Sequence, residues 1–411
     1  MGAKQSKSDS YSNIASECLN QIQKRSPLSI HEINQLQDHL KQIKIGGKQN
    51  LFTFLGDYNY KKDIKKVYSL VHELIIFSGI SIETANSVFE FLKECISSSY
   101  LELLPNKFQK VLLQEIFVVS KTKPSYFLAS KLFDCGLFPE NEIKDYIEHE
   151  IAFVSPQSIY ISCVFLGFIP ALTLSKLISQ TNSEYNLSIL NRKTLELIEN
   201  SKFIQEKEWN EFLSTKEFGI DRNSIEFYIF RDDICSIKQS SQDPLFDINS
   251  SINVHPLNPF PYFEMIPSLL ECSAFHGSLK CYRYLMINGA TLTFNKERLS
   301  ILHFSIIGTC YEIFRSLFKS QILDMECFKL SIKSRQHDIF LWLCENSLSF
   351  DFRNEIEFAK ISFNNCVLLS MENEMTFNEF SLVEAAIGGH YDLFMTIEKD
   401  VRLKSISFDV Y

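Results

Sequence analysis

The chain has 411 residues, with 41 Lys and Arg against 50 Asp and Glu, and its formal net charge at pH 7 is −9. A hydrophobic fraction of 45% with 13% aromatic residues can bury a large core, which excludes a chain that is disordered throughout. Gly and Pro number only 13 and 11, too few for the turns of a many-stranded β fold. The negative charge disfavours a nucleic-acid-binding surface. These totals predict a mostly helical, cytoplasmic protein that binds no nucleic acid.

The N-terminus carries a lipidation motif. Residues 1–6, MGAKQS, match the N-myristoylation pattern M-G-x-x-x-[ST], in which Gly2 becomes the first residue after Met removal and Ser6 fills the last position. We expect residues 1–12 to form a disordered leader that is acylated at Gly2. The alternative is an ordinary polar tail with no lipid.

A single myristoyl chain binds a membrane only marginally, so stable attachment needs a second signal. Residues 1–66 contain 11 Lys and Arg against 6 Asp and Glu, and residues 61–66 (KKDIKK) form the densest basic cluster. This cluster is a candidate contact with anionic lipid on the cytoplasmic face of a membrane. The alternative is the solvated start of a helix.

Helical patterns dominate the first half of the chain. Ser29 and Glu32 form a capping box, apolar residues follow at helical spacing to Ile43, and Gly46–Gly47 ends the run. Further periodic segments cover residues 64–78, 83–96, 107–119, 125–135, 140–152, 157–167, 171–179 and 193–213. Short helices joined by short connectors are typical of antiparallel pairs stacked side by side. We therefore expect an all-α protein, an α-solenoid, with residues 13–217 as one helical domain.

One apolar stretch resembles a membrane span. Residues 151–175 carry no charge, but Gly167 and Pro170 interrupt them, and the helix that Pro156 begins is too short to cross about 30 Å of hydrocarbon. The pattern favours two buried helices.

Residues 218–267 differ in composition from the segments on either side. Prolines at positions 256, 259, 261 and 267 remove backbone donors and prevent a regular helix. Aromatic residues such as Phe246 and Phe260 lie between them, which indicates a packed extended segment. We place a domain junction here.

Residues 268–411 contain self-similar segments. The first begins Ser268-Leu269-Leu270-Glu271, and the second, Ser300-Ile301-Leu302-His303, places Leu302 32 residues after Leu270. A third copy covers about 328–343, a weaker fourth about 356–369, and a fifth 381–394. A fixed period of this length is the signature of a repeat architecture.

These segments resemble ankyrin repeats, whose period is about 33 residues with a T-P-L-H-x-A motif. Ser268, Ser300 and Ser381 stand where the motif has Thr, and His303 keeps the motif histidine. The motif proline is missing throughout, and the third and fourth copies are shorter. The match covers about 265–411 and is closest to the divergent ankyrin-repeat proteins expanded in some unicellular eukaryotes, which have a helical N-terminal half.

The resemblance implies about five repeats and a non-enzymatic scaffold or adaptor that binds protein partners through the repeat surface, with no small-molecule substrate. The Ser–Glu pairs would cap the first helix of a repeat, and Gly277 would end it in a backbone conformation that other residues resist. His303 and His390 would bond the backbone. Phe275 and His276 precede Gly277, where ankyrin side chains tend to face the concave surface. They are candidate partner contacts, with simple packing as the alternative.

Catalytic and metal-binding patterns are absent from the sequence. The 11 Cys are irregularly spaced with no CxxC, which is typical of reduced, buried thiols, and the nine His supply no paired zinc ligands. Asp232–Asp233 favours a solvated cap over a carboxylate pair, because adjacent side chains diverge. We expect no catalytic residue, metal or cofactor. A soluble adaptor that is never acylated, and an enzyme with an unrecognised site in the N-terminal helical half, stay open as alternatives.

Overall fold

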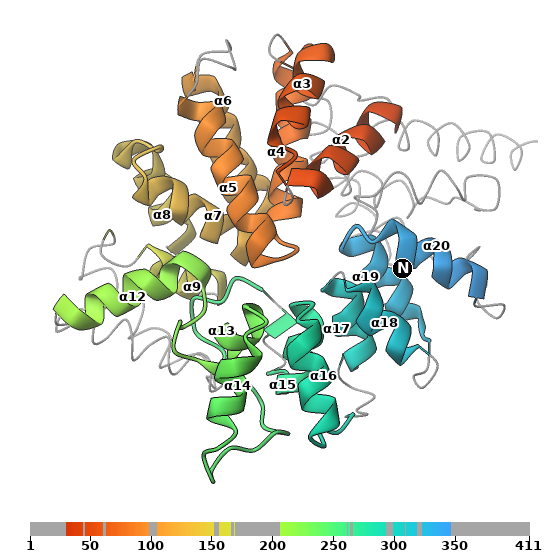
Figure 1. Ribbon diagram of the computed structural model, residues 1–411. Helices are drawn as coiled ribbons and strands as arrows, with labels where there is room; N and C mark the ends of the chain where they lie inside the picture. Colours follow the sequence, from red (N-terminus) through yellow and green to blue (C-terminus); the bar gives the residue numbers. More distant parts are fainter. Residues whose placement is uncertain are drawn as a thin grey trace, which may run out of the picture. The chain divides into compact units, whose positions relative to one another are not determined.

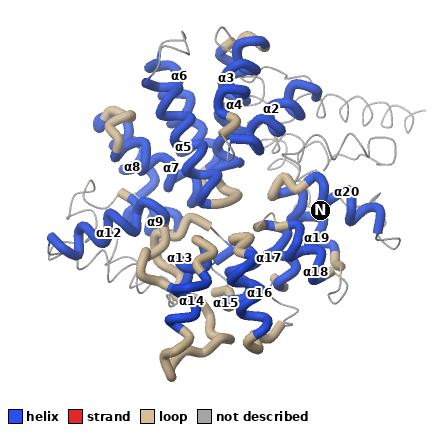
Figure 2. Tube along the Cα trace, in the orientation of Figure 1, coloured by secondary structure: helices blue, strands red, loops and turns tan. Residues whose placement is uncertain are grey.

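The computed structural model (Figure 1) describes residues 30–43, 46–60, 63–97, 105–151, 156–165, 168, 206–260, 262–263, 266–292, 299–308, 310–318 and 323–346. Helices make up the regular structure of these residues, which contain no strand beyond one isolated bridge between Ser251 and Ser268 (Figure 2). The all-α prediction is confirmed. The leader with Gly2, the segment 171–179, the fourth and fifth repeat copies and His390 lie outside the described residues.

The chain divides into two compact units, which differ from the predicted domains. One unit combines residues 1–70 with residues 320–411, and the other covers residues 71–319. The predicted boundaries at 217 and 268 both fall inside the second unit.

In the first unit, α2 (Ile30–Gln42) packs against α3 (Lys48–Asp57), a helix that the sequence analysis missed. Lys66, at the start of α4 (Ile64–Ser78), donates to Glu32 Oε1 at 2.7 Å and to the carbonyl of Tyr58 at 3.1 Å. Its ammonium also lies 5.6 Å from the ring centre of Tyr60. Lys66 therefore joins the helices of this unit, and this member of the basic cluster is engaged within the fold. The unit also contains the pair α19 (Met325–Lys333) and α20 (His337–Asn346).

The second unit begins with the helices that periodicity predicted. They are α5 (Ile82–Ser97), α6 (Pro105–Gln114), the π-helical turn η2 (Glu115–Ser120), α7 (Lys123–Asp134), α8 (Glu140–Ile151) and α9 (Pro156–Val164). The next described helix, α12 (Glu206–Phe218), ends at Phe218, beyond the predicted end at residue 213. Among the described residues, no helix combines the length and apolar character that a bilayer crossing requires.

Three short helix pairs follow in the same unit. They are α13 (Ile225–Phe230) with α14 (Ile234–Ser240), α15 (Leu269–Phe275) with α16 (Leu279–Ile287), and α17 (Ile301–Ile307) with α18 (Tyr311–Leu317). The first helices contact each other in the order α13, α15, α17, and the second helices in the order α14, α16, α18 (Figure 1). The pair α13/α14 lies inside the predicted junction. That segment is only partly extended, because its prolines begin at Pro256, after both helices have ended.

Three helix pairs share one turn geometry: α13/α14, α15/α16 and, in the first unit, α19/α20. The turn residue has a positive φ in three pairs: 50° at Asp232, 66° at Gly277 and 59° at Arg335. In each, the next N–H bonds the carbonyl five residues back, at 2.9 Å for Asp233 to Tyr228, 2.9 Å for Ser278 to Ser273, and 2.7 Å for Gln336 to Ser331. This is the Schellman arrangement, which satisfies carbonyls left open at a helix end. The expected role of Gly277 is confirmed.

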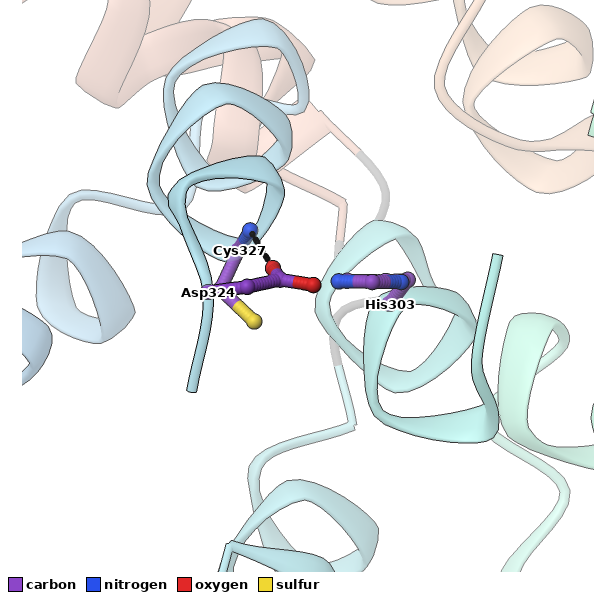
Figure 3. A group of neighbouring side chains, drawn as sticks. All are labelled: His303, Asp324 and Cys327. Atoms are coloured by element: carbon purple, nitrogen blue, oxygen red, sulfur yellow. Dashed lines mark hydrogen bonds between the residues drawn. The ribbon is translucent and has the colours of Figure 1, made fainter. Parts of the chain in front are cut away.

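The helix starts are capped as the sequence predicted. Ser268 N–H donates to Glu271 Oε2 at 2.8 Å, and Glu271 N–H donates to Ser268 Oγ at 3.2 Å. In α17 the imidazole of His303 replaces the carboxylate, and its Nδ1 accepts from Ser300 N–H at 2.9 Å, so its expected bond to the backbone is confirmed. Asp324 caps α19 by accepting from Cys327 N–H at 3.1 Å (Figure 3).

Asp232 and Asp233 cap two different helices. Asp233 accepts from the N–H groups of Cys235 and Ser236 at the start of its own helix, α14. Asp232 accepts from Cys281 N–H at 2.9 Å and Lys280 N–H at 3.3 Å, which are open donors at the start of α16. The cap role is confirmed, and Asp232 joins one helix pair to the next.

The backbones of α15 and α17 approach closely at their C-terminal ends. A Cβ on Gly308 would lie 2.1 Å from the carbonyl oxygen of Phe275 and 2.3 Å from that of Ala274. Gly308 has a φ of −73°, which any residue can adopt, so glycine is required here only because a side chain would not fit. Buried Ser273 and Ser305 keep the same helices narrow, and their hydroxyls donate to the carbonyls of Leu270 and Leu302 in the preceding turn.

We predict that Gly308→Ala lowers the free energy of unfolding by about 1–3 kcal/mol, the usual cost of overpacking a close contact. Gly79→Ala is the matched control, because its Cβ would meet Ile76 O at 3.3 Å and Pro124 at 3.5 Å or more, without a positive φ. Urea denaturation measures both. Equal stability of the two variants would contradict the close approach of α15 and α17.

Candidate functional site

A cavity of about 320 Å³ lies beside the first helix pair of the second unit. Its walls are the start of α13, an extended segment at 250–256 and the first residue of α15. The lining residues are Asp221, Ser224, Ile225, Glu226, Ser250, Ser251, Ile252, Asn253, Val254, His255, Pro256 and Leu269. Most of them belong to the segment in which the sequence analysis placed a junction.

The extended wall is held by backbone hydrogen bonds. Ile252 N–H donates to the carbonyl of Pro267 at 2.9 Å, and Leu269 N–H donates to the carbonyl of Ser250 at 3.1 Å. Burial alternates along it, with Ile252 and Val254 buried and Ser251 and Asn253 exposed. This period of two is that of a β-strand, and it brings alternate side chains to the core.

Glu226 is the most perturbed carboxyl of the site. It is 3% exposed, and Oε1 accepts from Asn258 Nδ2 at 2.9 Å. Asn258 is held in turn by the N–H of Phe260, which donates to Asn258 Oδ1 at 3.0 Å. Burial raises the pKa of Glu226 to about 8, although the hydrogen bond from Asn258 acts in the opposite direction. The carboxyl is therefore mostly protonated at pH 7.

The other polar groups of the cavity are oriented by local bonds. Ser224 Oγ accepts from Phe227 N–H at 3.2 Å and donates to the carbonyl of Asp221 at 2.7 Å. His255 Nδ1 accepts from Leu257 N–H at 3.2 Å, so the neutral ring carries its proton on Nε2. Neither Lys nor Arg is among the lining residues. The cavity therefore offers two carboxyls, an imidazole and hydroxyls, with no fixed positive charge.

The predicted contact residue Phe275 does not reach the surface. It is 1% exposed, and its ring centre lies 4.7 Å from that of Phe263 and 5.4 Å from that of Phe260. The prediction was wrong because Phe260 and Phe263 of the Pro-containing segment cover this end of α15. The sequence of the repeat itself does not show that another segment packs over Phe275.

His276 belongs to the same aromatic cluster. Its ring is 5.4 Å from Phe230 and 5.6 Å from Phe263, and its buried Nε2 has no hydrogen-bond partner in the described structure. Burial lowers the pKa of the imidazole to about 3, so it is neutral at pH 7. The ring is only partly exposed, which favours packing over the predicted partner contact.

The sequence analysis missed a His–Glu pair and a largely buried lysine in the N-terminal helices. His72 Nδ1 lies 2.5 Å from Oε1 of Glu115, the first residue of η2, and neither residue lines the cavity. The ammonium of Lys131 lies 5.4 Å and 5.2 Å from the ring centres of Phe89 and Phe127, and burial lowers its pKa to about 8. His72 and Glu115 are distant in sequence, as are Lys131 and Phe89, so no local motif marks these contacts; Phe127 precedes Lys131 by about one turn of α7.

Comparison with known proteins adds no family: no family model, curated protein or solved structure matched the chain. The site must therefore be interpreted from its own geometry.

We predict that Glu226→Gln removes a pH dependence of stability. The carboxyl titrates near 4.5 when unfolded and near 8 when folded, so the native state alone holds the proton between these values. The stability from this group is complete below pH 4.5 and falls, by about 1.4 kcal/mol per unit, as the pH rises to 8. The neutral amide lacks this slope.

Urea denaturation at pH 5, 6, 7 and 8 compares the two proteins. Glu312→Gln serves as the control because Glu312 is 66% exposed, and this variant should keep the wild-type slope. A Glu226→Gln slope equal to that of wild type would show that Glu226 is not a buried acid.

Proposed function

We propose that the protein is a non-enzymatic interaction scaffold of the ankyrin type, built as an α-solenoid that presents a repeat surface to protein partners. One observation carries the proposal: three helix pairs whose first helices each begin after an N-cap serine contact one another in sequential order, and two of them, α13/α14 and α15/α16, also share the same turn. Such pairs cannot bury their apolar faces alone and must stack on neighbours. The pair α13/α14 extends the series one unit upstream of the first repeat recognised in the sequence.

The contact surface that we favour is the edge formed where α14 and α16 end. Leu245 is 91% exposed, Ile287 84% and Met286 36%. The loops that carry this α14–α16 edge are tied together, because Asn249 Oδ1 accepts from Thr291 N–H at 2.8 Å and from its hydroxyl at 2.9 Å. Apolar side chains held on ordered loops are typical of protein contact sites.

N-myristoylation at Gly2 and peripheral attachment to the cytoplasmic face of a membrane form the second part of the proposal. Their support is the motif of residues 1–6 together with the basic bias of residues 1–66. Lys66 is held inside the first unit by Glu32. The lipid contact would therefore depend on the other lysines of the cluster.

An enzyme with its site among the N-terminal helices is the weaker alternative. Its one supporting observation is the pair of His72 and Glu115 beside a π-helical turn, a feature that is frequent at functional sites. His72 is only 13% exposed and Glu115 only 1%. Catalysis needs contact with a substrate, so we assign this pair to the core.

We predict that the α14–α16 edge contributes to partner binding. Proximity labelling and affinity capture from the full chain should recover the same proteins with wild type and with the control Leu213→Asp, whose site is 44% exposed on α12. The double variant Leu245→Asp, Ile287→Asp should reduce their recovery at least tenfold, as loss of a central apolar contact does. Unchanged recovery would exclude this edge, and no specific recovery with wild type would contradict the scaffold proposal.

We also predict that Gly2 is acylated. Metabolic labelling with an alkyne myristate should mark the wild-type chain and leave Gly2→Ala unlabelled, because the modification requires the glycine amine. Absence of label on wild type would leave the soluble adaptor as the correct form of the proposal.

A further inference from the structure

The cavity beside Glu226 combines hydrogen-bond acceptors with apolar walls. Asp221 and Glu226 are its acidic lining residues, and neither Lys nor Arg is among the residues that line it. The apolar part of the wall is formed by three buried residues, Ile252, Val254 and Leu269. A ligand that matches both features has a positively charged head and an apolar stem.

Glu226 has hydrogen-bonding capacity that the fold does not use. A carboxylate accepts at both oxygens, and among the described residues the hydrogen bond to Glu226 is the one from Asn258 to Oε1. The side chain is 3% exposed and belongs to the cavity wall. A buried carboxylate is costly without a compensating partner. A cation in the cavity would supply that partner.

We propose that this cavity binds a guanidinium or primary ammonium group at the end of an aliphatic stem, namely an Arg or Lys side chain of a partner protein, with Glu226 as its ion-pair partner. The inference rests on the proposed scaffold function and names the chemistry that the scaffold recognises. A volume of about 320 Å³ is at the lower end of the range for ligand pockets, which suits one long side chain.

The cavity is connected to the proposed contact edge by a single loop. The loop that carries Leu245 continues to Ser250, where the cavity wall begins. A partner segment lying on the edge can therefore direct one basic side chain into the cavity. The apolar contact and the ion pair would then belong to the same partner.

Binding of the cation releases one proton. The carboxyl of Glu226 is protonated at pH 7 because burial raises its pKa to about 8, and an ion pair requires the carboxylate. The proton passes to solvent as the cation enters. Two other ionisable residues, Asp221 and His255, line the same cavity. The thiol of Cys272 on α15 faces Glu226 and stays neutral, because burial raises the pKa of this thiol. The affinity should rise by at most about tenfold per pH unit up to pH 8.

The test uses the full chain and two small probes, n-butylguanidinium and its neutral analogue n-butylurea. Binding is measured by ligand-observed NMR at pH 6, 7 and 8.5. We expect wild type and Glu312→Gln to bind the cation tenfold or more tightly at pH 8.5 than at pH 6, and n-butylurea far more weakly. Glu226→Gln should bind the cation at least tenfold more weakly than wild type at pH 8.5, with no pH dependence. Proton release measured by calorimetry in two buffers should approach one per cation bound.

Three results would overturn the inference: no binding of n-butylguanidinium, equal binding of n-butylurea, or unchanged binding by Glu226→Gln. Capture of partners separates the inference from the scaffold proposal. Partners recovered equally by wild type and Glu226→Gln would leave the scaffold intact and remove the cation site from it. If n-butylguanidinium binds as expected but the capture experiment recovers no partner protein, the cavity binds a free small cation. That result would exclude the side chain of a partner protein as its ligand.

Discussion

Close backbone contact between consecutive helix pairs is the constraint on which the second unit depends. The space beside Gly308 is filled by the carbonyl oxygens of Ala274 and Phe275, so a side chain cannot be accommodated there. The buried serines of α15 and α17 serve the same end, because a small side chain lets two helices approach. The spacing of the pairs is thus fixed by backbone, and larger apolar residues fill what remains.

This spacing explains why polar side chains can act between pairs. Asp232 occupies a left-handed turn in one pair and caps α16 in the next, since the turn and the open N–H groups are held at bonding distance. Ser278, which precedes α16, donates to the carbonyl of Ile229 at 2.5 Å in the same place. The pairs α13/α14 and α15/α16 therefore complete each other's hydrogen bonding, which makes these two pairs mutually dependent.

The Pro-containing segment has a structural role that its composition did not predict. From Ser250 it runs extended beside residues 267–269 at the start of α15, and it then places Phe260 and Phe263 over Phe275. In doing so it buries Glu226 and supplies Asn258 as its partner. The same cover that removes Phe275 from the surface creates the cavity and raises the pKa of its carboxyl. The proposed cation site follows from that cover, and the loop that carries Leu245 joins it to the proposed contact edge.

The sequence by itself determined the features that depend on near neighbours along the chain. Helical periodicity located most helices of the first half, the Ser268–Glu271 capping box was recognised from its spacing, and the turn at Gly277 from its residue type. These rest on contacts within about four residues. Helix α3 and the pair α13/α14 were missed, because short segments carry too little periodic signal. Only the tertiary structure decided that Glu226 is a buried acid and that Phe275 is covered. Burial of a side chain depends on segments far away in the sequence, and Glu226 and its hydrogen-bond partner Asn258 are 32 residues apart.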